Sequence, residues 1–122
     1  MALHTVIWID HSQARIFDFD AEGVHEVDIE APHRHVRSRA AVSGRKEDSS
    51  GFFHDVAEKL GADHELLITG PSDAKLGLIK HIHAHHAALV PNIVGVETVD
   101  HPTDGQIVAY AKKYFRAADR MR

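Results

Sequence analysis

Three Asp-His pairs are the residues in this chain best suited to catalysis. They are Asp10-His11, Asp63-His64 and Asp100-His101. A carboxylate that orients a histidine makes up half of a catalytic triad. Neighbouring residues on a strand point to opposite faces of a sheet, so we expect no adjacent pair to act as a dyad by itself. Asp10 and His101, however, both lie at predicted strand ends and can meet across the sheet.

This placement supports the hypothesis of a small hydrolase or metal-dependent enzyme. Its candidate catalytic residues are Asp10, His11, Asp100 and His101. A serine hydrolase of the α/β type places its nucleophile in a Gly-x-Ser-x-Gly turn, and the sequence contains no such turn. The hypothesis therefore has candidate acids and bases but no identified nucleophile.

Histidine is unusually frequent, with 12 in 122 residues. Four of them lie close together: His81, His83, His85 and His86. On a helix, His81 and His85 are one turn apart, which is a feasible half-site for zinc. No glutamate adjoins either histidine to complete a metalloprotease motif, so a third ligand would come from elsewhere, such as His54 or Asp55. The alternatives are a surface histidine cluster without metal, and a pH-responsive or metal-buffering role. We expect no cofactor.

The segment from Thr69 to Lys75 joins a predicted strand to a predicted helix. Backbone amides at the start of a helix attract anions, so Ser72 and Lys75 are candidate anion-binding residues. The segment lacks the glycine spacing of a phosphate-binding loop. The alternative is an ordinary helix cap at Ser72, with Asp73 favoured by the helix dipole.

A net charge of −4 conceals two basic segments. Residues 32–46 contain five bases and no acid, namely Arg34, Arg37, Arg39, Arg45 and Lys46. Residues 112–122 contain five bases and one acid, Asp119. Such segments either contact RNA or an acidic protein or form solvated surface. We predict that the five bases of the first segment, together with Lys75, contact a partner.

Length and composition favour one domain over residues 1–122. That length is usual for a single domain, and 43% apolar with 26% charged residues are ordinary globular values. The chain has no cysteine, which excludes disulfides, thiolate zinc sites and cysteine nucleophiles. We recognise no signal peptide and no apolar run of membrane-spanning length, so we expect a cytoplasmic protein without membrane contact. The sequence does not indicate an oligomeric state.

The first half of the chain predicts strands and then a loop. Residues 5–10, 14–20 and 24–31 have short connections, which is typical of an antiparallel meander with one solvated face. Residues 32–49 are rich in Arg and Ser and are interrupted by Pro32 and Gly44, which predicts a mobile basic loop.

The second half alternates helices and strands. We expect a helix capped by Ser49 or Ser50, a strand over 65–69, a helix over about 73–89, a strand over 93–99, and a helix from Thr103 with a capping box to Gln106. The two later strands should be parallel, with a right-handed crossover. The order is β-β-β, loop, α-β-α-β-α, which predicts an α/β domain with a mixed sheet and helices packed on it.

Four segments together carry a family resemblance: Trp8-Ile9-Asp10-His11, Ala14-Arg15-Ile16-Phe17, residues 69–75, and residues 99–106. Over nearly the whole chain, they resemble a family of small bacterial proteins labelled translational machinery proteins. The segment 69–75 with its following helix is also similar to the third domain of class 1 peptide chain release factors and of Pelota.

The resemblance implies an α/β/α sandwich and a non-enzymatic domain that binds protein or RNA of the translation apparatus. In the release factors this domain docks protein partners, notably a translational GTPase. A ribosome-associated protein, a translational GTPase or RNA are therefore the expected partners. The hydrolytic Gly-Gly-Gln loop of release factors belongs to another domain, and this chain has no such tripeptide.

Overall fold

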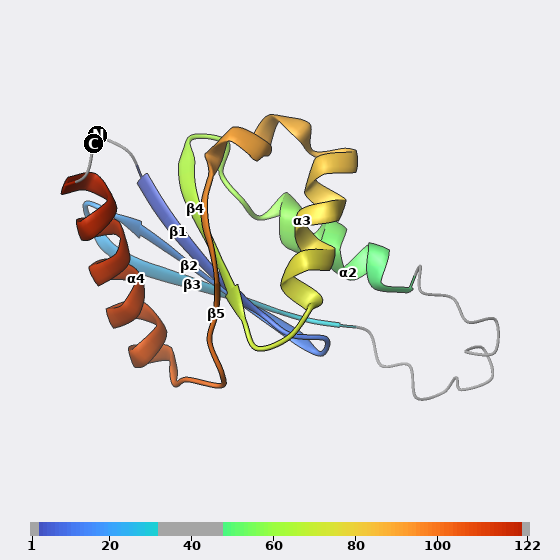
Figure 1. Ribbon diagram of the computed structural model, residues 1–122, viewed down its shortest axis with the longest axis horizontal. Helices are drawn as coiled ribbons and strands as arrows, with labels where there is room; N and C mark the ends of the chain where they lie inside the picture. The colour runs from blue at the N-terminus through green and yellow to red at the C-terminus, as the bar shows by residue number, and fades with distance from the viewer. Residues whose placement is uncertain (1–2, 32–47, 121–122) are drawn as a thin grey trace.

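The structure, a computed structural model, describes residues 3–31 and 48–120 (Figure 1). Its centre is a five-stranded sheet in the order β3-β2-β1-β4-β5. The strands are β1 (Leu3–Ile9), β2 (Gln13–Asp20), β3 (Gly23–Glu30), β4 (His64–Gly70) and β5 (Ile93–Thr98). The first three pair antiparallel, whereas β4 is parallel to both β1 and β5. The predicted mixed sheet with an N-terminal meander is confirmed.

Helices cover both faces of the sheet, so the fold is the expected α/β/α sandwich (Figure 1). Helices α2 (Asp48–Glu58) and α3 (Ala74–His85) lie on one face, and α4 (Asp104–Arg120) lies on the other. Alternation along β1 divides the core: Ile7 and Ile9 pack towards α2 and α3, while Val6 and Trp8 pack towards α4.

One turn and one helix cap follow the sequence closely. The Asp10 carboxylate accepts hydrogen bonds from the backbone amides of Ser12 and Gln13, both at 2.9 Å, and so closes the turn from β1 to β2. The predicted capping box of α4 is confirmed, because Gln106 N donates to Thr103 Oγ1 at 3.1 Å and Thr103 N donates to Gln106 Oε1 at 2.9 Å.

Some predicted boundaries are wrong. Helix α3 ends at His85, and the 3-10 helix η2 (Ala87–Asn92) replaces the rest of the predicted helix over 73–89. His86 leaves the helical conformation, with φ −139° and ψ 51°, and Pro91 lacks the amide that an α-helix would need. Helix α2 begins at Asp48, so it includes the last residues of the predicted loop over 32–49.

Strand β3 is more exposed than the expected single solvated face implies. All its residues except Ile29 are exposed, including Val24 and Val27 on opposite faces. The reason is its position at the edge of the sheet, beyond most of the area covered by the helices. No helix in the described part of the chain is both long and apolar enough to cross a membrane.

Candidate functional site

The three parallel strands end at the same edge of the sheet, and there the chain forms a pocket. After β4 it turns towards α3 on one face, and after β5 it turns towards α4 on the other (Figure 1). In open α/β sheets, ligands bind in the crevice where connections diverge in this way. The pocket has a volume of about 600 Å³ and is lined by Thr69, residues 99–102, Gln106, Ile107 and Tyr110. Burial and the negative Glu97 raise the pKa of Tyr110, so its phenol stays a hydrogen-bond donor at neutral pH.

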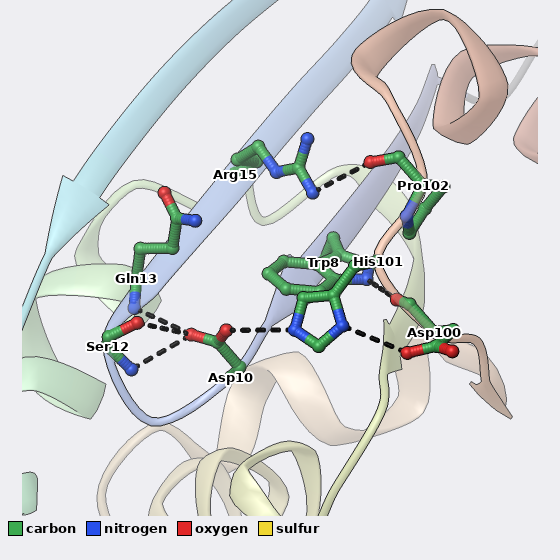
Figure 2. A network of polar contacts seen from close by, with 8 residues as sticks. All are labelled: Trp8, Asp10, Ser12, Gln13, Arg15, Asp100, His101 and Pro102. Atoms are coloured by element: carbon green, nitrogen blue, oxygen red, sulfur yellow. Dashed lines mark hydrogen bonds and ion pairs between the residues drawn. The ribbon is translucent and has the colours of Figure 1, made fainter.

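His101 lies at this pocket between two carboxylates (Figure 2). Its Nδ1 is 2.9 Å from Asp100 Oδ1, and its Nε2 is 3.7 Å from Asp10 Oδ2. The predicted meeting of Asp10 and His101 is therefore confirmed. The expectation that Asp100 and His101 cannot pair is wrong, because they follow the end of β5 in a bend where strand alternation no longer applies.

The backbone around His101 is held by two residues that the sequence predictions did not include, Trp8 and Arg15 (Figure 2). Trp8 is fully buried, and its Nε1 donates to the carbonyl of Asp100 at 2.8 Å. The Arg15 guanidinium lies 4.5 Å from the Trp8 ring centre and donates to the carbonyl of Pro102 at 3.1 Å. Both residues belong to segments that carry the family resemblance, and Arg15 is also the sole Lys or Arg among the first 31 residues.

Asp10 is a stable carboxylate rather than a proton donor. Burial alone would raise its pKa, but hydrogen bonds from the backbone of Ser12 and Gln13 and from the Ser12 hydroxyl, together with nearby His101, lower its pKa below the ordinary value. Ser12 Oγ donates to Asp10 at 3.0 Å (Figure 2). Within the described network, the Ser12 hydroxyl is therefore bonded to the Asp10 carboxylate and not to the His101 imidazole.

His11 and His64 do not join this network. His11 Nε2 pairs with Asp73 at 2.8 Å, and this contact lowers the pKa of the Asp73 carboxyl. His64 Nδ1 lies 2.7 Å from Thr5 Oγ1, near the start of β1 and therefore at the opposite end of the sheet. Of the four candidate catalytic residues, the structure brings together Asp10, Asp100 and His101.

Ser72 and Lys75 lie together at the start of α3, but Lys75 points inwards. The residue is 7% exposed, and its Nζ donates to the Ser72 carbonyl at 2.7 Å. The N-cap of α3 is Asp73 rather than Ser72, and its side chain makes no capping hydrogen bond. Anion or partner binding by Ser72 and Lys75 stays a prediction, and Lys75 would have to leave the Ser72 carbonyl to take part.

Two other predicted groups lie elsewhere. Arg34, Arg37, Arg39, Arg45 and Lys46 are outside the described residues, so their partner contacts stay a prediction. The rings of His81 and His85 are 4.6 Å apart, but the nitrogens of His81 cluster with those of His54 and His86 instead.

Comparisons with known proteins identify the fold. A scan of protein-family models and a search of curated proteins found no match. Among solved structures, Pelota of Archaeoglobus fulgidus is similar, with a TM-score of 0.63 and 21% identity over 92% of this chain. Pelota of Thermoplasma acidophilum has a TM-score of 0.58 and 16% identity over 85% of this chain.

An archaeal translation termination factor, aRF1, is also found, with a TM-score of 0.44 and 16% identity over 98% of this chain and 39% of that chain. This chain spans about a third of the Pelota chains, at 31% and 30% of their lengths. The resemblance to Pelota is therefore confirmed at the level of the fold of one part of that protein.

Proposed function

We propose that this chain is a non-enzymatic binding domain that docks onto a protein or ribonucleoprotein of the translation apparatus in the cytoplasm. The observation that carries the proposal is the likeness to Pelota, which covers 92% of this chain but 31% of that protein. A fold by itself does not determine function, so the proposal also depends on the surface of this chain.

The pocket at the carboxyl ends of the strands supports binding rather than catalysis. Its apolar walls come from Val99, Pro102 and Ile107, and polar groups of His101 and Gln106 border them. Apolar pockets with a few placed polar groups are typical binding sites. The pocket is suited to a side chain of the partner, while the basic residues between 34 and 46 supply charge attraction.

A pull-down tests this proposal. The full chain, carrying a streptavidin-binding tag because its own histidines would confuse a polyhistidine tag, is incubated with bacterial and archaeal lysates at low and moderate salt. Captured protein and RNA are identified by mass spectrometry and sequencing. We expect ribosomal proteins, a translational GTPase or a defined RNA, and we expect their loss when Arg34, Arg37, Arg39, Arg45 and Lys46 are all changed to Ala.

A charge-matched comparison variant changes five exposed bases outside that segment to Ala: Lys59, Lys80, Lys112, Lys113 and Arg116, of which the last three belong to the second basic segment. For an RNA partner, losing five phosphate contacts should lower the slope of log affinity against log salt by about 4. If the comparison variant loses binding and the first variant keeps it, the assignment of the basic contacts is wrong. If the unmodified chain captures no component of the translation apparatus at either salt, the proposal fails.

A small hydrolase is the second candidate, because His101 lies within reach of two carboxylates beside a pocket. A histidine base oriented by a carboxylate can activate a substrate water. A screen of carboxylic and phosphate esters tests this, with His101→Gln as the inactive variant and His83→Gln, an exposed histidine on α3, as the control. Equal turnover by the two variants would exclude His101 as the base.

A further inference from the structure

Three histidines from separate parts of the helical layer converge on one point. His54 belongs to α2, His81 to α3, and His86 to the cap that ends α3. Their ring centres are 6.0 Å apart for His54 and His81, and 5.3 Å apart for His54 with His86 and for His81 with His86. One nitrogen of each ring lies within 4.8 Å of one nitrogen of each of the others.

His81 and His86 each carry one ring nitrogen without a hydrogen-bond partner among the described residues. In both residues this nitrogen is Nε2, and it is buried. A buried polar atom without a partner is costly, and natural proteins seldom keep one without a reason such as a bound ion. Burial, reinforced by the neighbouring His85, His86 and His54, also lowers the pKa of His81, which keeps its imidazole neutral and able to donate a lone pair.

We propose that His54, His81 and His86 form a binding site for a divalent transition-metal ion, with Zn²⁺ as the ion of best fit. Three imidazoles without a thiolate or carboxylate match the preferences of Zn²⁺ and exclude hard ions such as Mg²⁺ and Ca²⁺. Zn–N bonds of about 2.0–2.1 Å in tetrahedral geometry place ligand nitrogens about 3.3 Å apart. The three ring nitrogens, which lie within 4.8 Å of one another, would therefore have to approach by about 1.5 Å or less.

The surroundings agree with a metal site. His54 Nε2 lies 3.5 Å from Glu58 Oε2, one helical turn away, and an outer carboxylate of this kind commonly orients a ligating histidine. Phe53 packs near the His81 ring, with centres 6.4 Å apart, and shields one side. With three protein ligands, a fourth position is left for water or for a ligand from a partner.

This inference differs from the sequence prediction and goes beyond the proposed function. The sequence prediction already named His54 as a candidate third ligand, but it paired His81 with His85, which is exposed, whereas His86 provides the remaining nitrogen here. Helical periodicity could not predict that His86 lies beside His54 and His81, because His86 is the residue at which α3 ends. The site also lies on the α2 and α3 face of the sheet, away from the α4 face that borders the pocket of the candidate functional site.

Calorimetry on the full chain without a polyhistidine tag tests the site. After treatment with a chelator and dialysis, the protein is titrated with Zn²⁺ at neutral pH. We expect one equivalent to bind with a Kd below about 1 µM, and His54→Ala or His86→Ala to weaken binding by about 100-fold or more, since even outer-shell changes cost 10–100-fold. The exposed His83→Ala is the matched control and should bind as the unmodified chain does.

A second measurement keeps the test independent of folding defects. His54 is exposed, so His54→Ala should leave the far-ultraviolet circular dichroism unchanged. Co²⁺ in place of Zn²⁺ should give the strong visible absorption of a four-coordinate ion in the unmodified chain and lose it in His54→Ala. Binding no tighter than about 10 µM in the unmodified chain, or tight binding that survives both His54→Ala and His86→Ala, would overturn the proposal.

Discussion

Gly70, the last residue of β4, lies against the backbone of Ile9 at the end of β1 and accepts a hydrogen bond from Val99 N at 3.1 Å, so Gly70→Ala should be strongly destabilising. Its φ is +157°, and a Cβ built there would lie 2.1 Å from the carbonyl oxygen of Ile9. That is more than about 1 Å inside the shortest ordinary carbon–oxygen contact. The obstacle is backbone in the central strand and not a flexible side chain, so it can move only with the sheet.

The magnitude follows from these two effects. An unfavourable φ costs about 1–3 kcal/mol, and forcing extra volume into a packed site costs about 1–3 kcal/mol. Alanine also lowers the conformational entropy of the unfolded chain, which offsets about 0.4–1 kcal/mol of this loss. We expect a net loss of about 3 kcal/mol in the free energy of unfolding, which for 122 residues lowers Tm by about 12 °C at an unfolding entropy near 2.1 cal/mol/K per residue.

Urea unfolding followed by Trp8 fluorescence and by circular dichroism measures the loss. Gly23→Ala is the matched control, because Gly23 also has a positive φ, +136°, but no atom within 4 Å of a built Cβ. Gly23→Ala should therefore lose only the stability that its unfavourable φ costs, without a steric clash. If Gly70→Ala loses no more stability than Gly23→Ala, the close approach to Ile9 is not what requires glycine, and the reasoning is wrong.

Three further predictions concern the same edge of the sheet. Asp10→Asn should lower the free energy of unfolding by about 1 kcal/mol at pH 7. Because folding lowers the pKa of Asp10, the stability difference between the two proteins should shrink as the pH falls below 3.8. A difference that stays constant in acid unfolding curves would contradict this. Thr103→Ala should cost about 1 kcal/mol through the lost cap of α4, measured by thermal unfolding, whereas Thr103→Ser should cost little. Trp8→Phe should lower the free energy of unfolding, measured by circular dichroism, by about 2–3 kcal/mol, because it removes the hydrogen-bond donor to the Asp100 carbonyl and creates a cavity. A loss under about 0.5 kcal/mol would show that this hydrogen bond is not needed for stability.

The sequence was sufficient for elements whose local pattern is strong. Short apolar runs predicted β1, β2 and β4, and the short connections predicted the meander. The capping box was predictable because Thr103 and Gln106 interact within one helical turn. Helix α3 was predicted too long, because the apolar periodicity of residues 73–89 continues past His86, where the backbone leaves the helical conformation.

The candidate sites were less predictable because they depend on register and on irregular backbone. Asp10 and His101 were expected to meet, since both follow strands of one sheet. The support from Trp8 and Arg15 depends on how β1 and β2 align with the segment after β5, which no local pattern encodes. His54 and His86 meet through the packing of α2 against the end of α3, which is equally remote in sequence.

The exposed edge strand also bears on how the protein behaves at high concentration. Glu26, Asp28 and Glu30 alternate along β3, the last strand of the described sheet. If the edges of two copies paired, these acids would face one another, and like charges directly opposite are unfavourable. Residual burial and the neighbouring Asp28 raise the pKa of Glu26 to about 7, so this carboxylate loses its charge in mild acid. Mild acid should therefore weaken the barrier to aggregation along β3 well before it unfolds the domain.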